Sequence, residues 1–354
     1  MIIITLKIKN VLSLGFVFFL FYVFFTNAKN IGSYLENSLK FCALSVIPSL
    51  FPYMCASSVI TYTACLDGIS KHIPEKLFSI LGVCRKYFVQ IICGCVCGFV
   101  TGAVCICDKY ACSDDQRSFS DSIILCSNAG VGFTVGYVGV LLWGSLHFGI
   151  LLYLTQIFVA FTINAIINCK TAYEENSISQ SKALPLLSSL SRSVSVSCMS
   201  IIKVCGFTVF FSLVTDTTSK TFGLCESNDF YRIMCVAIEF CRGTTVSASA
   251  ASPSFAAALT GFCIGFGGIC VHSQIFSVCE GYPLNKSRFF LFKTVQGIFC
   301  AIFAYVYATI FDFSPSSYVP TFSCFYGTAF FAFCIITVFV IIIKIKNIFF
   351  RKSN

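Results

Sequence analysis

The stretch HFGILLYLTQIFVAFTINAIIN, residues 147–168, decides the fold class of the chain. It contains no Lys, Arg, Asp or Glu, and about 20 predominantly apolar residues are enough for a helix to cross a bilayer. Comparable apolar runs fill most of the remaining sequence, at 11–27, 41–66, 88–107, 122–143, 197–214, 255–279, 289–311 and 322–343, with a shorter run at 230–248. The sequence therefore predicts an all-α integral membrane protein that crosses the bilayer many times.

The composition of the whole chain supports this class. Of the 354 residues, 57% are hydrophobic and 11% are charged, whereas soluble domains carry about 25% charged residues. The apolar excess extends along the entire sequence, which excludes a soluble domain held by a single anchor. The lipid bilayer is therefore the expected environment.

The net charge of +9 raises the question of a nucleic-acid partner. The basic residues stand singly or in pairs at the ends of apolar runs, which is the pattern of membrane topology, and we expect no nucleic acid. The last basic group is expected to face anionic lipid from the cytoplasm: Lys344, Lys346, Arg351 and Lys352.

The 23 cysteines allow two interpretations. Most lie inside apolar runs, where thiols pack as small hydrophobic groups. The densest group could instead bind a metal or serve redox chemistry, but it lacks paired CxxC spacing and a nearby His: Cys93, Cys95, Cys97, Cys105, Cys107 and Cys112. We favour packing and expect neither a metal nor a cofactor.

The runs at 88–107 and 230–248 are either full spans or re-entrant hairpins. If both span, there are ten helices, with 14 basic residues inside and 8 outside. If both are re-entrant, there are about eight transmembrane helices, with 17 inside and 5 outside, which obeys the positive-inside rule better. Both arrangements place the protein in the cell membrane with its N- and C-termini in the cytoplasm.

The eight-helix arrangement divides the chain into two similar units. Helix, re-entrant loop, helix, helix occurs twice, and Ile150–Gln156 aligns with Phe290–Gln296 at an offset of 140. Because each unit has three true spans, the two would be inverted across the membrane, as in secondary transporters. The expected layout is a signal-anchor helix (or a cleaved signal peptide), a first gate-like repeat, a polar linker, a second gate-like repeat and a C-terminal helix with a basic tail: 1–34, 35–168, 169–195, 196–311 and 312–354.

Ionisable and polar residues inside apolar runs are the candidate substrate-binding residues, because a charge in the bilayer usually faces a cavity or a partner. They are Glu239, Arg242, His272, Gln274, Asn128, Lys203 and Thr101. Glu239, Arg242 and Lys203 could instead have purely structural roles. Glu239 and Arg242 can pair with each other on one helix face, and the Lys203 side chain can reach the membrane interface. Lys293, near a predicted helix start, is expected at the interface.

Enzyme motifs are absent from the sequence, which has no GxSxG, HExxH or P-loop. Catalytic residues are therefore not assigned, and the chain is expected not to be an enzyme. The missing P-loop also argues against an ATP-driven pump.

Three segments together resemble a known family. Gly265–Gln274 is similar to the GG-x-x-VH-x-Q signature of sporulation integral membrane proteins, which carry paired nucleoside-recognition, or gate, domains. Ser38–Pro52 resembles their proline-broken first gate element, and Ile238-Glu239 followed by Gly243 resembles their second re-entrant motif. Two family prolines are absent, at Val100 and Val131. The resemblance implies a role in endospore formation and movement of a small anionic metabolite such as dipicolinate.

Two functions follow as hypotheses. The first is a transporter that holds an anion between two re-entrant tips, with Lys203 or Arg242 as countercharge. The second is a non-transporting membrane scaffold or assembly factor for sporulation. Convergence of Glu239, His272 and their polar companions Asn128 and Lys203 on one water-accessible cavity favours transport, whereas dispersal favours a scaffold.

The re-entrant arrangement predicts that residues 75 and 115 lie on the same side of the membrane. Single cysteines placed there in a cysteine-free variant should react with an impermeant thiol reagent from one side only, and from the same side. Labelling from opposite sides would exclude the re-entrant arrangement of 88–107.

Overall fold

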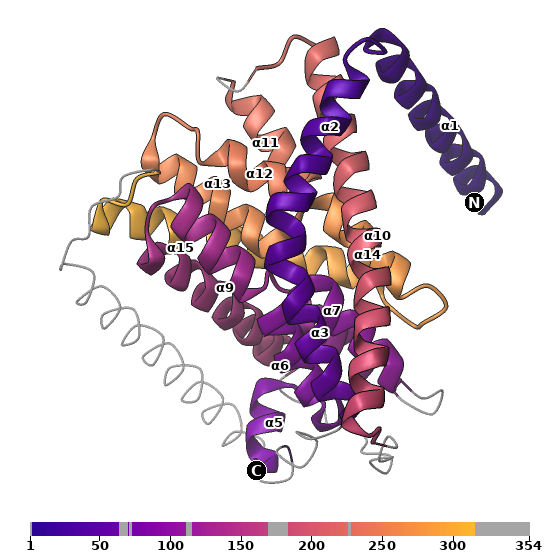
Figure 1. Ribbon diagram of the computed structural model, residues 1–354, viewed down its shortest axis with the longest axis vertical. Helices are drawn as coiled ribbons and strands as arrows, with labels where there is room; N and C mark the ends of the chain where they lie inside the picture. The colour runs from indigo at the N-terminus through magenta and orange to yellow at the C-terminus, as the bar shows by residue number, and fades with distance from the viewer. Residues whose placement is uncertain are drawn as a thin grey trace.

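The structure, a computed structural model, describes residues 2–63, 70, 73–110, 115–168, 183–225 and 228–315, with backbone alone for 2–9 and Ser49. All of the regular structure in these residues is helical (Figure 1). The first half contains α1 (Ile2–Thr26), α2 (Ile31–Phe41), η1 (Cys42–Val46), α3 (Ile47–Thr63), α5 (Glu75–Leu81), η2 (Arg85–Tyr87), α6 (Phe88–Cys97), α7 (Phe99–Lys109), α8 (Gln116–Cys126), η3 (Gly132–Leu142) and α9 (Leu146–Ile167). The second contains α10 (Leu186–Thr221), α11 (Asp229–Ile238), α12 (Phe240–Ser247), α13 (Pro253–Phe266), α14 (Gly268–Val278) and α15 (Lys286–Phe311).

Four helical stretches are long and apolar enough to cross a membrane: α9, α10, α13 with α14, and α15. Two bent pairs raise the number to six if each is one span, and one of them joins α1 to α2 at an angle of 103°. The fold is thus compatible with a multi-pass membrane protein. The predicted run at 322–343 and the basic tail lie outside the described residues.

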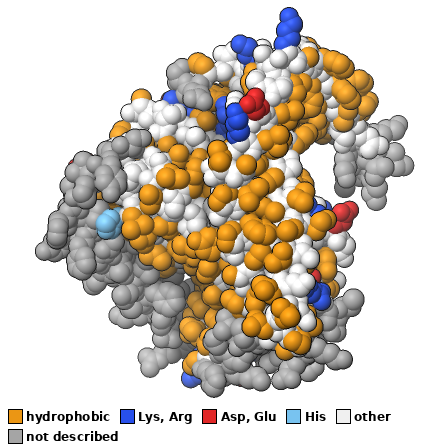
Figure 2. All heavy atoms as spheres, in the orientation of Figure 1, with side chains coloured by type: hydrophobic (Ala, Val, Ile, Leu, Met, Phe, Trp, Pro, Cys, Tyr) orange, Lys and Arg blue, Asp and Glu red, His pale blue; other side chains and the backbone are white. Residues whose placement is uncertain are grey.

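The outer surface has the character expected of helices in lipid. Large hydrophobic side chains are exposed along most of the long helices, among them Phe25, Leu44, Leu141, Leu187 and Leu291. Figure 2 shows hydrophobic side chains over most of one face, with few charged ones. Exposed apolar area of this extent marks a surface that contacts lipid or protein rather than water.

The predicted proline-broken helix is a long rod whose helical turns continue from α2 through η1 to α3. Proline has no N–H to donate, so Pro48 and Pro52 each remove a hydrogen bond from the helix ladder. The chain accommodates this loss with the wider turns of η1, where Ile47 N–H donates to the Cys42 carbonyl five residues earlier. The rod lies alongside α10 (Figure 1).

Helix α10 extends into the segment that the sequence predicts to be a polar linker. It begins at Leu186, inside the segment 169–195 that the sequence assigns to a polar linker, and continues to Thr221. Its serines explain this, because Ser189, Ser193 and Ser197 recur at helical spacing and are all buried. Small side chains on one face allow close helix packing, so a polar composition here serves the contact with α3.

Each segment predicted to be re-entrant folds as a helical hairpin. In α6–α7 the tip is Gly98, with φ +108°, and a Cβ built on Gly94 would lie 2.9 Å from the Gly102 Cα. In α11–α12 the tip is Glu239, and a Cβ built on Gly243 would lie 2.8 Å from the Val236 Cα. Residues placed symmetrically about each tip therefore touch, and the small residues allow the two arms to pack.

A broken helix follows each hairpin. The first is α8 and η3, separated at 127–131, and it is followed by α9, which packs on η3. The second is α13 and α14, interrupted at Gly267 and Gly268 with φ of +84° and +73°. It is followed by α15, which packs closely on α13.

The α13–α15 contact provides a stability test. A Cβ on Gly261 would lie 2.5 Å from the Cys300 carbonyl oxygen and 2.6 Å from the Ala304 Cβ. Gly261→Ala should therefore lower the melting temperature in detergent, since overpacking costs about 1–3 kcal/mol. Gly206→Ala on α10, where nothing lies within 4 Å, is the matched control and should be neutral or stabilising. Equal effects of the two variants would contradict this packing.

Candidate functional site

The candidate site lies where the four breaks in the chain meet. A Cβ on Gly130, in the first broken helix, would lie 3.0 Å from the Cys97 carbonyl beside the first hairpin tip. A Cβ on Gly268, in the second broken helix, would lie 3.1 Å from the Ile238 carbonyl oxygen beside the second tip. Glycine at these two positions brings each tip into backbone contact with the broken helix of its own half. Across the halves, α7 packs on α14 and α12 on η3.

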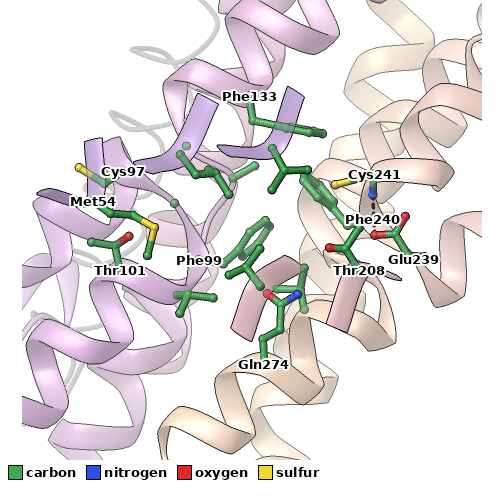
Figure 3. Close-up of a pocket in the computed structure, with 18 residues that line it drawn as sticks. Met54, Cys97, Phe99, Thr101, Phe133, Thr208, Glu239, Phe240, Cys241 and Gln274 are labelled. Carbon is green, nitrogen blue, oxygen red and sulfur yellow. Dashed lines mark hydrogen bonds between the residues drawn. The ribbon is translucent and has the colours of Figure 1, made fainter. Parts of the chain in front are cut away.

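A cavity of about 40 Å³ lies between the two tips (Figure 3). A water molecule needs roughly 10–15 Å³ measured in this way, so there is room for a few water molecules. The aromatic rings of Phe99 and Phe240, one from each tip, meet edge to face with centroids 5.2 Å apart. The other described lining residues are Val46, Leu50, Met54, Cys97, Gly98, Val100, Thr101, Ala129, Gly130, Phe133, Val204, Thr208, Glu239, Cys241, Val271 and Gln274.

Thr101 places a buried hydroxyl in the cavity wall. It is the third residue of α7, it is 3% exposed, and its hydroxyl bonds to no other described residue. The N-cap of α7 is Gly98, which has no side chain to cap the helix. The first N–H groups of a helix carry its positive end, so α7 presents hydrogen-bond donors at this wall.

Glu239 is a cap for its own hairpin as well as a cavity residue. Its carboxylate, 1% exposed, accepts from the backbone N–H of Cys241 at 3.1 Å and of Arg242 at 2.5 Å. The Arg242 side chain points elsewhere, since it pairs with Asp216 at 2.9 Å and binds the Tyr231 hydroxyl at 2.9 Å. Glu239 thus bonds to the peptide N–H of Arg242, while the guanidinium of Arg242 holds α12 against α10 and α11.

A buried polar network stands directly behind the cavity wall. The Lys293 ammonium group donates to the carbonyl oxygen of Ser127, to Asn128 Oδ1 at 3.3 Å and to Gln296 Oε1 at 2.8 Å. Gln296 Nε2 donates to Asn128 Oδ1 and to the Gln156 carbonyl, both at 2.9 Å. Asn128 therefore joins the broken helix to α15 and does not line the cavity.

The interface position expected for Lys293 is corrected by its burial. Its exposed fraction is 0%, because α15 begins seven residues earlier, at Lys286, and Lys293 faces the protein interior. The sequence carried a signal for this, since Lys293 and Gln296 are three residues apart and share one helix face.

The side chain of Gln156 forms hydrogen bonds to the backbone at the break in the first broken helix. Its Nε2 donates to the Ala129 carbonyl at 2.7 Å, and its Oε1 accepts from the Ala129 N–H at 3.1 Å. The N–H and the carbonyl of Ala129 are thereby both satisfied by one side chain, which fixes the cavity wall next to Gly130.

Two of the remaining candidates, His272 and Lys203, lie apart from the cavity. His272 was expected to share it with Glu239, but His272 Nε2 bonds to the Phe266 carbonyl at 2.8 Å and the ring packs among phenylalanines. Its role is to close the break before α14. Lys203 is exposed on α10. Gln274 does line the cavity, so Glu239, Gln274 and Thr101 are the predicted residues that the structure brings together there.

The cysteine cluster is spread over the first hairpin. Cys93, Cys95, Cys97, Cys105 and Cys107 are buried in α6 and α7, whereas Cys112 lies outside the described residues. Within the described part of the chain, no group of three or more His, Cys, Asp or Glu is arranged to hold a metal ion.

The cavity also has residues that the sequence did not single out. Thr208 of α10 and the two facing rings, Phe99 and Phe240, complete it. Both phenylalanines directly follow a hairpin tip, which is the signal that would have found them. No family model, characterised protein or solved structure matches the chain.

The clamp by Gln156 can be tested against another buried glutamine. Gln156→Leu leaves both peptide groups of Ala129 unpaired, at about 1–3 kcal/mol for each buried group, and should markedly lower the melting temperature. Gln90 on α6 is 1% exposed and its Oε1 has no partner among the described residues, so Gln90→Leu should be neutral or stabilising. Similar losses for the two variants would contradict the clamp.

Proposed function

We propose that the chain is a membrane transporter that holds a small polar solute between the tips of its two hairpins. Of the four residues whose convergence would favour transport over a scaffold, only Glu239 lines the cavity, so the proposal does not rest on that convergence. The observation that carries it is the cavity at the meeting point of four chain breaks. Helix breaks inside a membrane are tolerated where they line a cavity, and transporters place their substrates at such breaks. Buried polar side chains at the wall, Thr101, Glu239 and Gln274, support binding of a hydrogen-bonding solute.

The proposal includes two inverted repeats. Each half has a long helix, a hairpin, a broken helix and a final helix, in that order. The tips Gly98 and Glu239 are 141 residues apart, and Gln156 and Gln296 are 140 apart. Pairing of α7 with α14 and of α12 with η3 supports a two-fold relation between the halves. With about eight spans, such repeats provide the symmetric gates that alternating access needs.

The cavity lining favours an uncharged polar solute over a dianion. The described lining residues include one carboxylate, Glu239, and no Lys, Arg or His. Neither of the two expected countercharges lines the cavity, since Lys203 is exposed on α10 and Arg242 pairs with Asp216. Dipicolinate, suggested by the resemblance to sporulation proteins, would meet only the positive end of α7 and would face the Glu239 carboxylate. A hydroxylated or amide-bearing solute such as a nucleoside suits the wall better.

In the described conformation the cavity is small, with a volume of about 40 Å³. Space for a few water molecules does not admit a nucleoside, so the two hairpins must separate during each transport cycle. The contacts across the site suit such separation because the ring contact of Phe99 with Phe240 is apolar and holds no ion pair.

The hydroxyl of Thr101 offers a direct functional test. In proteoliposomes, Thr101→Val should lower uptake of labelled nucleosides by about 2- to 10-fold, since one hydrogen bond contributes about 0.5–1.5 kcal/mol. Thr134→Val is the matched control, because Thr134 is 0% exposed, its hydroxyl has no described partner and it is not part of the wall. It should transport normally. Dipicolinate uptake by the wild-type protein is measured in parallel and should be weaker than nucleoside uptake.

Failure has two distinct forms. Uptake that is equally reduced in both threonine variants would contradict a role of the cavity in binding the solute. Absence of uptake of every solute by the wild-type protein, with normal folding, would favour the scaffold function instead.

A further inference from the structure

Lys293 is surrounded in the way that a bound cation is surrounded. Its nitrogen contacts three oxygens, from the Ser127 backbone and from the amides of Asn128 and Gln296. The three acceptors match the three N–H groups of an ammonium, whereas a neutral amine has only two N–H groups to donate. No carboxylate of the described residues forms an ion pair with it.

The orientation of both amides is fixed by their other bonds. Asn128 Nδ2 donates to the Leu125 carbonyl at 2.7 Å, and Gln296 Nε2 donates to the Gln156 carbonyl at 2.9 Å. Reversing either amide would bring its NH₂ group against the ammonium and a carbonyl against a carbonyl. The oxygens are therefore turned inward by the fold, independently of the lysine.

The position in the fold also favours a cation. Helix α8 ends at Cys126, and Ser127 is its C-cap, so the last carbonyls of the helix, which have no partner further along it, carry the negative end of the helix dipole. Carbonyl groups at the ends of broken helices are common ligands for Na⁺ and similar ions inside membranes. The buried charge is held by neutral oxygens and by this dipole.

We propose that Ser127, Asn128 and Gln296 form a monovalent-cation site at the first broken helix, and that the Lys293 ammonium group permanently occupies it. The protein therefore carries its own cation at a place where Na⁺ or K⁺ from solution would otherwise bind. The site abuts Ala129 and Gly130 of the cavity wall, so its occupation fixes that wall. The wild-type protein should then be indifferent to the alkali cation present.

Removing the lysine side chain should open the site to small cations. Thermal unfolding of the purified full chain in detergent is measured in choline, sodium, potassium, ammonium and methylammonium chloride at equal ionic strength. Wild type should melt at the same temperature in all five salts. Lys293→Ala should melt lower in choline, which is too large to enter, and should regain several degrees, saturably, with at least one of the small cations.

Two control variants make the result specific. Lys203→Ala removes a lysine that is exposed on α10 and should behave as wild type in every salt. Lys293→Met keeps the aliphatic volume without a charge, so it should melt below wild type and should not respond to cations. Replacing a buried charge by an apolar side chain is often neutral or stabilising, so this loss is specific to a cation site.

The contrary outcomes are equally clear. A cation response of Lys293→Ala that equals the response of Lys203→Ala would overturn the proposal. If Lys293→Ala aggregates in every salt, Lys293→Met decides, and melting at or above the wild-type temperature would overturn it. Because these unfolding measurements involve no transported substrate, their outcome is separate from that of the transport assays.

Discussion

The fold depends on one constraint, which is that the backbone groups freed at each helix break must find partners inside the protein. Unpaired peptide groups in an apolar interior cost several kcal/mol each, and no water in a bilayer can take their place. Four side chains meet this requirement at three breaks. Glu239 caps α12, Gln156 pairs both groups of Ala129, Lys293 binds the end of α8 and His272 binds the end of α13. The fourth break, at the tip of the first hairpin, occurs at a glycine.

This constraint separates polar residues that build the site from those that are available to a solute. Lys293, Asn128 and Gln156 are fully engaged with the chain and with one another, and they shape the wall from behind. Thr101 and Gln274 face the cavity, and neither is used to close a break. A transporter needs both kinds of polar residue. Residues that pair with the broken backbone hold the wall in place, while a side chain with few bonds to the protein can form hydrogen bonds to the solute instead. The carboxylate of Glu239 does both.

The sequence predicted the helical membrane class and the two hairpins because those properties are local. Small residues on either side of Gly98 and Glu239, together with short apolar runs, identified elements that fold back on themselves. The placement of the polar residues could not be predicted in the same way, since each partner lies far along the chain. Lys293 near a helix start suggested the interface, whereas its partners at Ser127 and Asn128 bring it inside. The serine-rich start of α10 was assigned to a linker because of its polar composition, although its serines are buried and α10 packs on the proline-containing rod.

The central claim is that the hairpin of the first half packs against the broken helix of the second, so that the cavity lies between the halves. The Sγ atoms of Cys107 in α7 and of Cys279, which directly follows α14, are 3.8 Å apart, across that contact. In a variant that retains only these two cysteines and carries a protease site within 169–182, oxidation should form a disulfide. The two halves should then remain covalently joined after cleavage and separate on reduction. Separation of the oxidised, cleaved halves, as for variants with either cysteine alone, would contradict the account.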